Sequence, residues 1–172
     1  MPQRPTAHFM LSHPAHAIAL GLGAGLSPFA PGTAGTLWAW VSFLVLQPWM
    51  NDLRWALLIA IALIVGWWAC SVTARNMGVI DPGSIVWDEV VAFWLVLWLI
   101  TPVGLLGQMA AFALFRFFDA VKPGPVGWAD RLFHEQARSG TAAGWRFAGL
   151  GILWDDLVAA FCTLLVIALW RF

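Results

Sequence analysis

The sequence predicts an all-α integral membrane protein with about five transmembrane helices and a short N-terminal interfacial helix. Only 10% of the 172 residues are charged, whereas a soluble domain carries about 25%. Hydrophobic residues make up 61% of the chain, and the mean hydropathy is +0.79. A soluble fold of this size needs more polar side chains to cover its surface. The apolar runs also lack the alternation that a membrane β-barrel requires.

The charge balance and the cysteines exclude other classes of protein. Nine basic residues match nine acidic ones, so no basic surface for a nucleic acid is expected. Cys70 and Cys162 both lie in apolar runs, which argues against a disulfide-stapled secreted domain. We predict a single membrane-embedded domain over residues 1–172, with no nucleic-acid partner and an oligomeric state that the composition leaves open.

The expected helices follow from uncharged runs of sufficient length. Residues 55–74 contain no charge, and twenty helical residues cover the hydrocarbon thickness of about 30 Å. The uncharged stretch 90–115 is divided at Thr101-Pro102, because proline interrupts a helix. Residues 13–25 form the expected interfacial helix. The five expected spans cover residues 36–50, 55–74, 85–100, 105–121 and 152–170.

Basic residues set the expected orientation. Threading five spans places seven of the nine Lys and Arg residues on the N-terminal side of the membrane. The positive-inside rule therefore predicts a cytoplasmic N-terminus. The seven are Arg4, Arg75, Arg116, Lys122, Arg131, Arg138 and Arg146. Eight of the nine acidic residues fall on the same side, and only Asp52 falls opposite.

Two acid pairs occur in similar surroundings. Residues 85–93 (IVWDEVVAF) align without a gap with residues 152–160 (ILWDDLVAA), and each segment is expected to place its acids one turn into a helix. The pairs are Asp88-Glu89 and Asp155-Asp156. Four carboxylates at one membrane level need cations, and oxygen ligands favour Mg²⁺ or Mn²⁺ over zinc. The alternative is that these acids only cap helices or face headgroups.

A charged stripe and a glycine-rich segment are further candidates. Arg116, Asp119 and Lys122 are spaced three residues apart and share one helix face, which suits a metal and an anionic oxygen together; the alternative is an exposed salt-bridge ladder. Residues 23–36 are expected to form a loop before the first span. Its free N–H groups, with the Thr33 and Thr36 hydroxyls, can hold a phosphate, although the segment is equally consistent with a structural turn.

Four segments together identify a family resemblance. GLSPFAPGTAGT, DPGSIVWDEVVAFW, FRFFDAVKPGPVGWADR and GLGILWDDLVAA occur in an order that resembles the phosphatidylglycerophosphatase A family over nearly the whole chain. The resemblance implies a Mg²⁺-dependent lipid phosphatase of the bacterial inner membrane. Its substrate would be phosphatidylglycerophosphate, whose terminal phosphate is removed to give phosphatidylglycerol, by a water or through a phospho-aspartate.

On this interpretation the site lies at the cytoplasmic headgroup level. The expected catalytic residues, which would also hold one or two Mg²⁺ ions, are Asp88, Glu89, Asp119, Asp155 and Asp156. The expected phosphate-binding residues are Arg116, Lys122, Arg131, Thr33 and Thr36. The chain departs from the family pattern by an insertion over residues 134–147 and by alanine at Ala92, Ala148 and Ala160.

Two other classes of function use similar residues. A cation-coupled transporter or channel would use the acidic cluster as an ion path, but the opposite membrane face offers only Asp52 to continue it. A lipid phosphotransferase that uses a cytidine nucleotide would need a longer aspartate-rich helix signature than this sequence contains.

Overall fold

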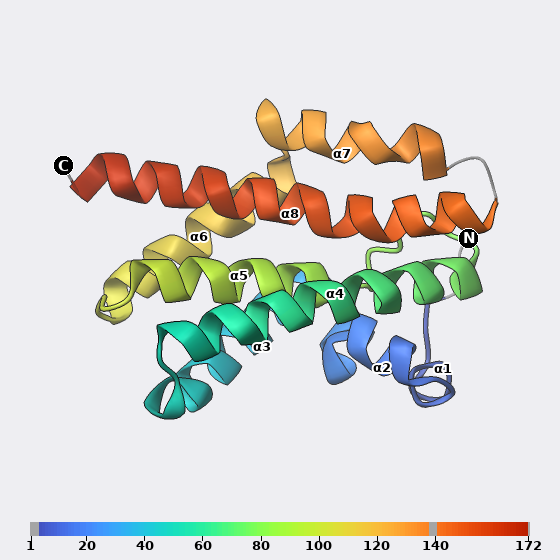
Figure 1. Cartoon of the computed structure of the whole chain (residues 1–172), viewed down its shortest axis with the longest axis horizontal. Helices are drawn as coiled ribbons and strands as arrows, with labels where there is room; N and C mark the ends of the chain where they lie inside the picture. Colours follow the sequence, from blue (N-terminus) through green and yellow to red (C-terminus); the bar gives the residue numbers. More distant parts are fainter. Residues whose placement is uncertain (1–3, 138–140, 172) are drawn as a thin grey trace.

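The computed structural model describes residues 4–137 and 141–171, and these residues form helices and no strands (Figure 1). The all-α prediction is therefore confirmed for this part of the chain. The helices are α1 (Ala7–Leu11), α2 (Pro14–Ala19), the 3₁₀ helix η1 (Gly21–Leu26), α3 (Pro31–Leu46), the 3₁₀ helix η2 (Gln47–Trp49), α4 (Asp52–Met77), α5 (Trp87–Ile100), α6 (Leu105–Val121), α7 (Pro125–Ala137) and α8 (Ala142–Arg171).

Helices α4, α5 and α8 run side by side along the long axis of the molecule (Figure 1). Helix α7 packs on α8, while α3 and α6 pack against α5 and α2 packs against α4. The N-terminus lies at one end of the long axis and the C-terminus at the other (Figure 1). Helix α5 is thus enclosed by α3, α4, α6 and α8.

Two helices are long and apolar enough to cross a membrane, namely α4 and residues Ala143–Trp170 of α8. Helices α3, α5 and α6 have 16, 14 and 17 residues, fewer than the roughly 20 that a helix needs to cross the hydrocarbon core at right angles. By this measure the structure supports membrane association, and the remaining three spans stay a prediction.

Two segments that were expected to be loops are largely helical in the structure. Helix α3 begins at Pro31 rather than near Thr36, because proline is favoured in a first helical turn, so Thr33 and Thr36 are helical. Within the expected loop 122–151, α7 forms and α8 begins at Ala142. Of the insertion 134–147, residues 138–140 lie outside the described part of the chain.

Helix α8 begins ten residues earlier than expected, and this added part packs closely on α4 at Gly149. A Cβ atom on Gly149 would lie 2.1 Å from Ser71 Oγ and 2.8 Å from the backbone oxygen of Trp67 on α4. The missing side chain therefore lets α8 pack against α4 without ending the helix. Consequently Asp155 and Asp156 lie in the middle of a 30-residue helix, and the expectation that they lie one turn into it is wrong.

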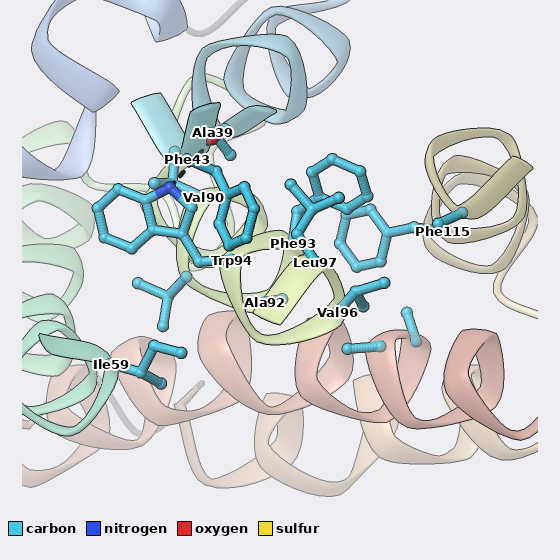
Figure 2. Close-up of a cluster of buried hydrophobic side chains, with 14 of the residues drawn as sticks. Ala39, Phe43, Ile59, Val90, Ala92, Phe93, Trp94, Val96, Leu97 and Phe115 are labelled. Carbon is cyan, nitrogen blue, oxygen red and sulfur yellow. Dashed lines mark hydrogen bonds between the residues drawn. The ribbon is translucent and has the colours of Figure 1, made fainter. Parts of the chain in front are cut away.

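The main hydrophobic core surrounds α5 (Figure 2). Phe93, Trp94 and Leu97 are buried between side chains of the neighbouring helices. Trp94 Nε1 donates a hydrogen bond to the Ala39 carbonyl oxygen on α3 at 3.0 Å. This packed core lies one to two turns beyond the acids at the start of α5, so it holds the first turn of α5 in place.

Candidate active site

Three carboxylates from two helices meet at the start of α5. Asp88 and Glu89 lie in the first turn of α5, and Asp156 lies midway along α8. One oxygen from each carboxylate lies within 4.8 Å of the other two. Glu89 is 8% exposed and Asp156 is 2% exposed. The fold thus brings together acids that are far apart in the sequence.

The start of α5 suits acidic side chains and is fixed by a tryptophan. The residue before the helix is Val86, whose side chain cannot cap it, and anionic groups are stabilised near the free N–H groups of a helix N-terminus. Trp87 Nε1 donates a hydrogen bond to the Ala62 carbonyl oxygen on α4 at 3.0 Å. A Cβ atom on Gly66 would lie 2.5 Å from the Trp87 ring. This contact sets the rotation of the turn that carries the acids.

The oxygens of this cluster fit a hard metal ion. Asp88 Oδ1, Glu89 Oε2 and Asp156 Oδ2 are inaccessible to solvent, and none has a hydrogen-bond partner within the described part of the chain. A buried carboxylate oxygen without a partner is costly. A divalent cation would satisfy all three oxygens, and ligands made only of oxygen suit Mg²⁺ or Mn²⁺.

Arg116 on α6 lies beside the carboxylate cluster. Its guanidinium forms an ion pair with Asp119, and Nη1 lies 3.7 Å from Glu89 Oε1 and 3.5 Å from Thr36 Oγ1. Asp119 in turn lies close enough to Asp156 to interact with it. The side chain of Arg116 is 19% exposed, so the residue is not fully closed off from solvent.

Lys122 and Asp155 form a second ion pair at the other side of the site. Lys122 ends α6 in a left-handed conformation with φ of 47°, and its Nζ atom contacts Asp155 Oδ2 on α8. Adjacent residues of a helix point about 100° apart, which explains why Asp155 meets Lys122 while Asp156 meets the acids of α5. The stripe Arg116, Asp119 and Lys122 is therefore not an exposed salt-bridge ladder, because each member has a partner and is at most 29% exposed.

The N-terminus of α3 closes the site from a fourth direction. A Cβ atom on Gly32 would lie 2.3 Å from Glu89 Oε1 and 3.1 Å from both Nη atoms of Arg116. Thr36 is fully buried, and its hydroxyl donates to the Gly32 carbonyl oxygen at 2.8 Å. Thr33 is half-buried in the same turn. The sequence analysis did not single out Gly32. A glycine at the second position of a helix was the feature that could have indicated a close contact there.

One expected phosphate ligand lies elsewhere. Arg131 is exposed on α7, and the described side chains show no contact between it and the carboxylate cluster. The other nine expected residues lie around this one location, contributed by α3, α5, α6 and α8. Their arrangement offers a buried set of oxygen ligands beside a guanidinium and an ammonium, which can bind a metal and a phosphate together.

A family model and two curated relatives point to one family. The family model described as Phosphatidylglycerophosphatase A matches residues 17–171. A Phosphatidylglycerophosphatase A of Escherichia coli (strain K12) is 37% identical over 149 residues, which cover 87% of this chain and 78% of the relative. A Phosphatidylglycerophosphatase A of Haemophilus influenzae is 36% identical over 95% of this chain and 92% of the relative. A Bacteroides thetaiotaomicron protein with the provisional name phosphatidylinositol-3-phosphatase is 35% identical, with 90% and 91% covered. No solved structure matches the chain.

Proposed function

The chain belongs to the phosphatidylglycerophosphatase A family and is a phosphatase, and on this premise we propose that it removes the terminal phosphate of phosphatidylglycerophosphate in a Mg²⁺-dependent reaction. The proposed location is the cytoplasmic face of the bacterial inner membrane. The observation that supports it best is the group of three buried carboxylate oxygens without partners, on Asp88, Glu89 and Asp156. The guanidinium of Arg116 lies beside this group, 3.7 Å from the other carboxylate oxygen of Glu89, Oε1.

The depth of the acids supports a site just beneath the cytoplasmic headgroups. We take α3, α4, α5, α6 and α8 as the five spans. Asp156 lies 15 residues before Arg171, which corresponds to about 22 Å along α8. With Arg171 at the periplasmic boundary of a core of about 30 Å, Asp156 lies about 8 Å inside the cytoplasmic boundary. Helix α5 starts at this same depth, which accounts for its short length. The substrate's acyl chains can then stay in the bilayer while its phosphate reaches the site.

The carboxylates would hold the metal. Asp88, Glu89 and Asp156 provide the inner oxygens, while Asp119 and Asp155 complete the acidic shell. When bound, Mg²⁺ supplies positive charge to the phosphate oxygens and favours attack at phosphorus. The charge of the ion would offset the repulsion between Asp88, Glu89 and Asp156, while Asp119 and Asp155 are paired with Arg116 and Lys122.

The basic residues and α3 would position the phosphate. Arg116 offers a planar pair of donors that matches two phosphate oxygens, and Lys122 adds a second positive charge. The free N–H groups at the start of α3 and the Thr33 hydroxyl would add donors for the same anion. Thr36 orients Arg116 by accepting a hydrogen bond from its Nη1 atom. The Thr36 hydroxyl can only accept here, because its own proton is donated to the Gly32 carbonyl oxygen.

The net reaction breaks the bond between phosphorus and the terminal glycerol oxygen. Water supplies the oxygen of the new bond to phosphorus and the proton that the glycerol oxygen takes up, so the products are phosphatidylglycerol and inorganic phosphate.

A cation path through the molecule has less support. The described acids gather at one end of α5, and the described part of the opposite end offers only Asp52. Between them, Phe93, Trp94 and Leu97 fill the space around α5 (Figure 2). A path for ions needs polar groups along its length, and this core provides apolar ones.

Phosphate release tests the proposal. Purified protein is mixed with detergent micelles that contain phosphatidylglycerophosphate, and inorganic phosphate is measured with Mg²⁺ and with a chelator. We expect release only with Mg²⁺, and slower release from phosphatidylinositol-3-phosphate. Equal release with and without divalent cations would contradict the metal assignment, and preferential release from the inositol lipid would contradict the substrate.

A further inference from the structure

A second pocket lies between α4 and the N-terminal part of α8. It has a volume of about 400 Å³, and the residues that define its chemistry are Trp67, Trp68, Arg75, Trp145 and Arg146. None of these residues belongs to the carboxylate cluster. We propose that this pocket binds the phosphate headgroup of an anionic bilayer phospholipid, separately from the active site.

The two arginines of the pocket are available to an anion. Arg75 and Arg146 are both exposed, and neither forms an ion pair with another residue in the described ranges, whereas Arg116 and Lys122 are both paired. Two guanidinium groups at one pocket match the geometry of phosphate oxygens. Basic pockets between transmembrane helices on the cytoplasmic side typically bind anionic headgroups.

The tryptophans give the pocket an apolar wall next to its charges. Trp67 and Trp68 are 38% and 46% exposed. Trp67 Nε1 donates a hydrogen bond to the Arg146 carbonyl oxygen at 2.9 Å, which joins the two helices at the rim. Tryptophan is enriched where a membrane meets water. A molecule that places a phosphate by the arginines and an acyl chain along the indole rings fits both parts.

The position of the pocket on α8 separates it from the active site. Arg146 precedes Asp156 by ten residues, or about 15 Å along the helix axis. With α4 and α8 in the proposed orientation, this places Arg75 and Arg146 at the cytoplasmic boundary. Trp145 and Arg146 also belong to the insertion 134–147, so the proposal gives that departure from the family pattern a function.

Native mass spectrometry of the detergent-purified full chain tests the proposal. The protein is titrated with dioleoylphosphatidylglycerol, with dioleoylphosphatidylcholine and with inorganic phosphate. We expect retention of the anionic lipid only. Because each basic residue near an anionic surface contributes roughly a fivefold gain in affinity, the double variant Arg75→Gln/Arg146→Gln should bind about 25-fold more weakly.

Two controls make the outcome decisive. Arg54→Gln removes an arginine from the other end of α4 and should leave lipid retention unchanged. Arg116→Gln changes the active site and should also leave it unchanged. Loss of the lipid in Arg116→Gln but not in the double variant would place the lipid in the active site and overturn the proposal, as would equal retention of both lipids.

The phosphatase assay and thermal unfolding separate other failures. The double variant should keep the phosphatase activity and the unfolding temperature of the wild type in lipid-free detergent. An active wild type whose lipid retention does not depend on Arg75 and Arg146 would refute the second pocket and leave the proposed function intact. If the double variant unfolds early, the single variants Arg75→Gln and Arg146→Gln must each weaken retention, and unchanged retention in both would refute the proposal.

Discussion

Gly32 of α3 and Glu89 of α5 lie in direct contact across the candidate active site. A Cβ atom on Gly32 would lie 2.3 Å from Glu89 Oε1, a separation at which one of the two groups must move. The same Cβ would lie 3.1 Å from the Arg116 nitrogens. The start of α3 therefore sets the position of one acid and one base at once.

Replacing this glycine should reduce activity without unfolding the protein. In Gly32→Ala the new methyl group displaces Glu89 and Arg116, and a displacement of about 1 Å can reduce turnover roughly 100-fold. Phosphate release and thermal unfolding measure the two effects. Gly104→Ala is the matched control, because a Cβ there meets nothing within 4 Å. An active Gly32→Ala would mean that Glu89 needs no fixed position.

The acids of α5 and α8 should govern the response to Mg²⁺. Asp88→Asn and Asp156→Asn each keep the shape of the side chain but remove one charge, so turnover should fall about 100-fold or more and Mg²⁺ activation should weaken. Asp52→Asn is the control, because Asp52 accepts a hydrogen bond from Trp98 at 3.1 Å far from the site and an amide oxygen can replace it. Equal losses in all three variants would indicate misfolding.

Arg116 and Asp119 should differ in what their replacement changes. Arg116→Lys keeps the charge but loses the planar fork, so activity should fall at least about tenfold while the Mg²⁺ concentration for half activation stays nearly constant. Asp119→Asn should raise that concentration. Their direct ion pair will couple the two effects, and the double variant measures this coupling. A midpoint shift in Arg116→Lys alone would reverse the two roles.

Reporter fusions test the orientation. Five spans with a cytoplasmic N-terminus place a reporter fused after Phe172 in the periplasm and one inserted between Arg138 and Gly144 in the cytoplasm. Alkaline phosphatase and green fluorescent protein, which are active on opposite sides of the inner membrane, provide the measurement. Two reporters in the same compartment would contradict an odd number of spans between them.

The sequence predicted the elements whose signals are local. Uncharged runs and Thr101-Pro102 predicted α5 and α6 to within two residues. Helix α7 and the first ten residues of α8 were missed, because their sequences are too polar or too rich in glycine to read as membrane spans. In the structure α7 packs along α8, and the early part of α8 packs on α4 at Gly149. Such tertiary packing can override local signals.

The site was predicted less completely than the helices. The repeated acid pairs predicted that Asp88, Glu89 and Asp156 would lie together, and the spacing of Arg116, Asp119 and Lys122 predicted their common face. The sequence could not show that Asp155 turns to Lys122, because that depends on the rotation of α8. The sequence also could not show that Arg131 lies on α7, away from the carboxylate cluster, because the position of α7 depends on its packing against α8.

The central place of the acids in α8 has a consequence for biosynthesis. The ribosome makes Asp88, Glu89 and Asp119 first, and the carboxylate of Asp156 joins them only when the last helix of the described chain has packed against α5. Until then the proposed donor set lacks one of its three carboxylates. On the proposed assignment, completion of the metal site would therefore be linked to packing of the final helix, so that only the assembled enzyme would act on lipid.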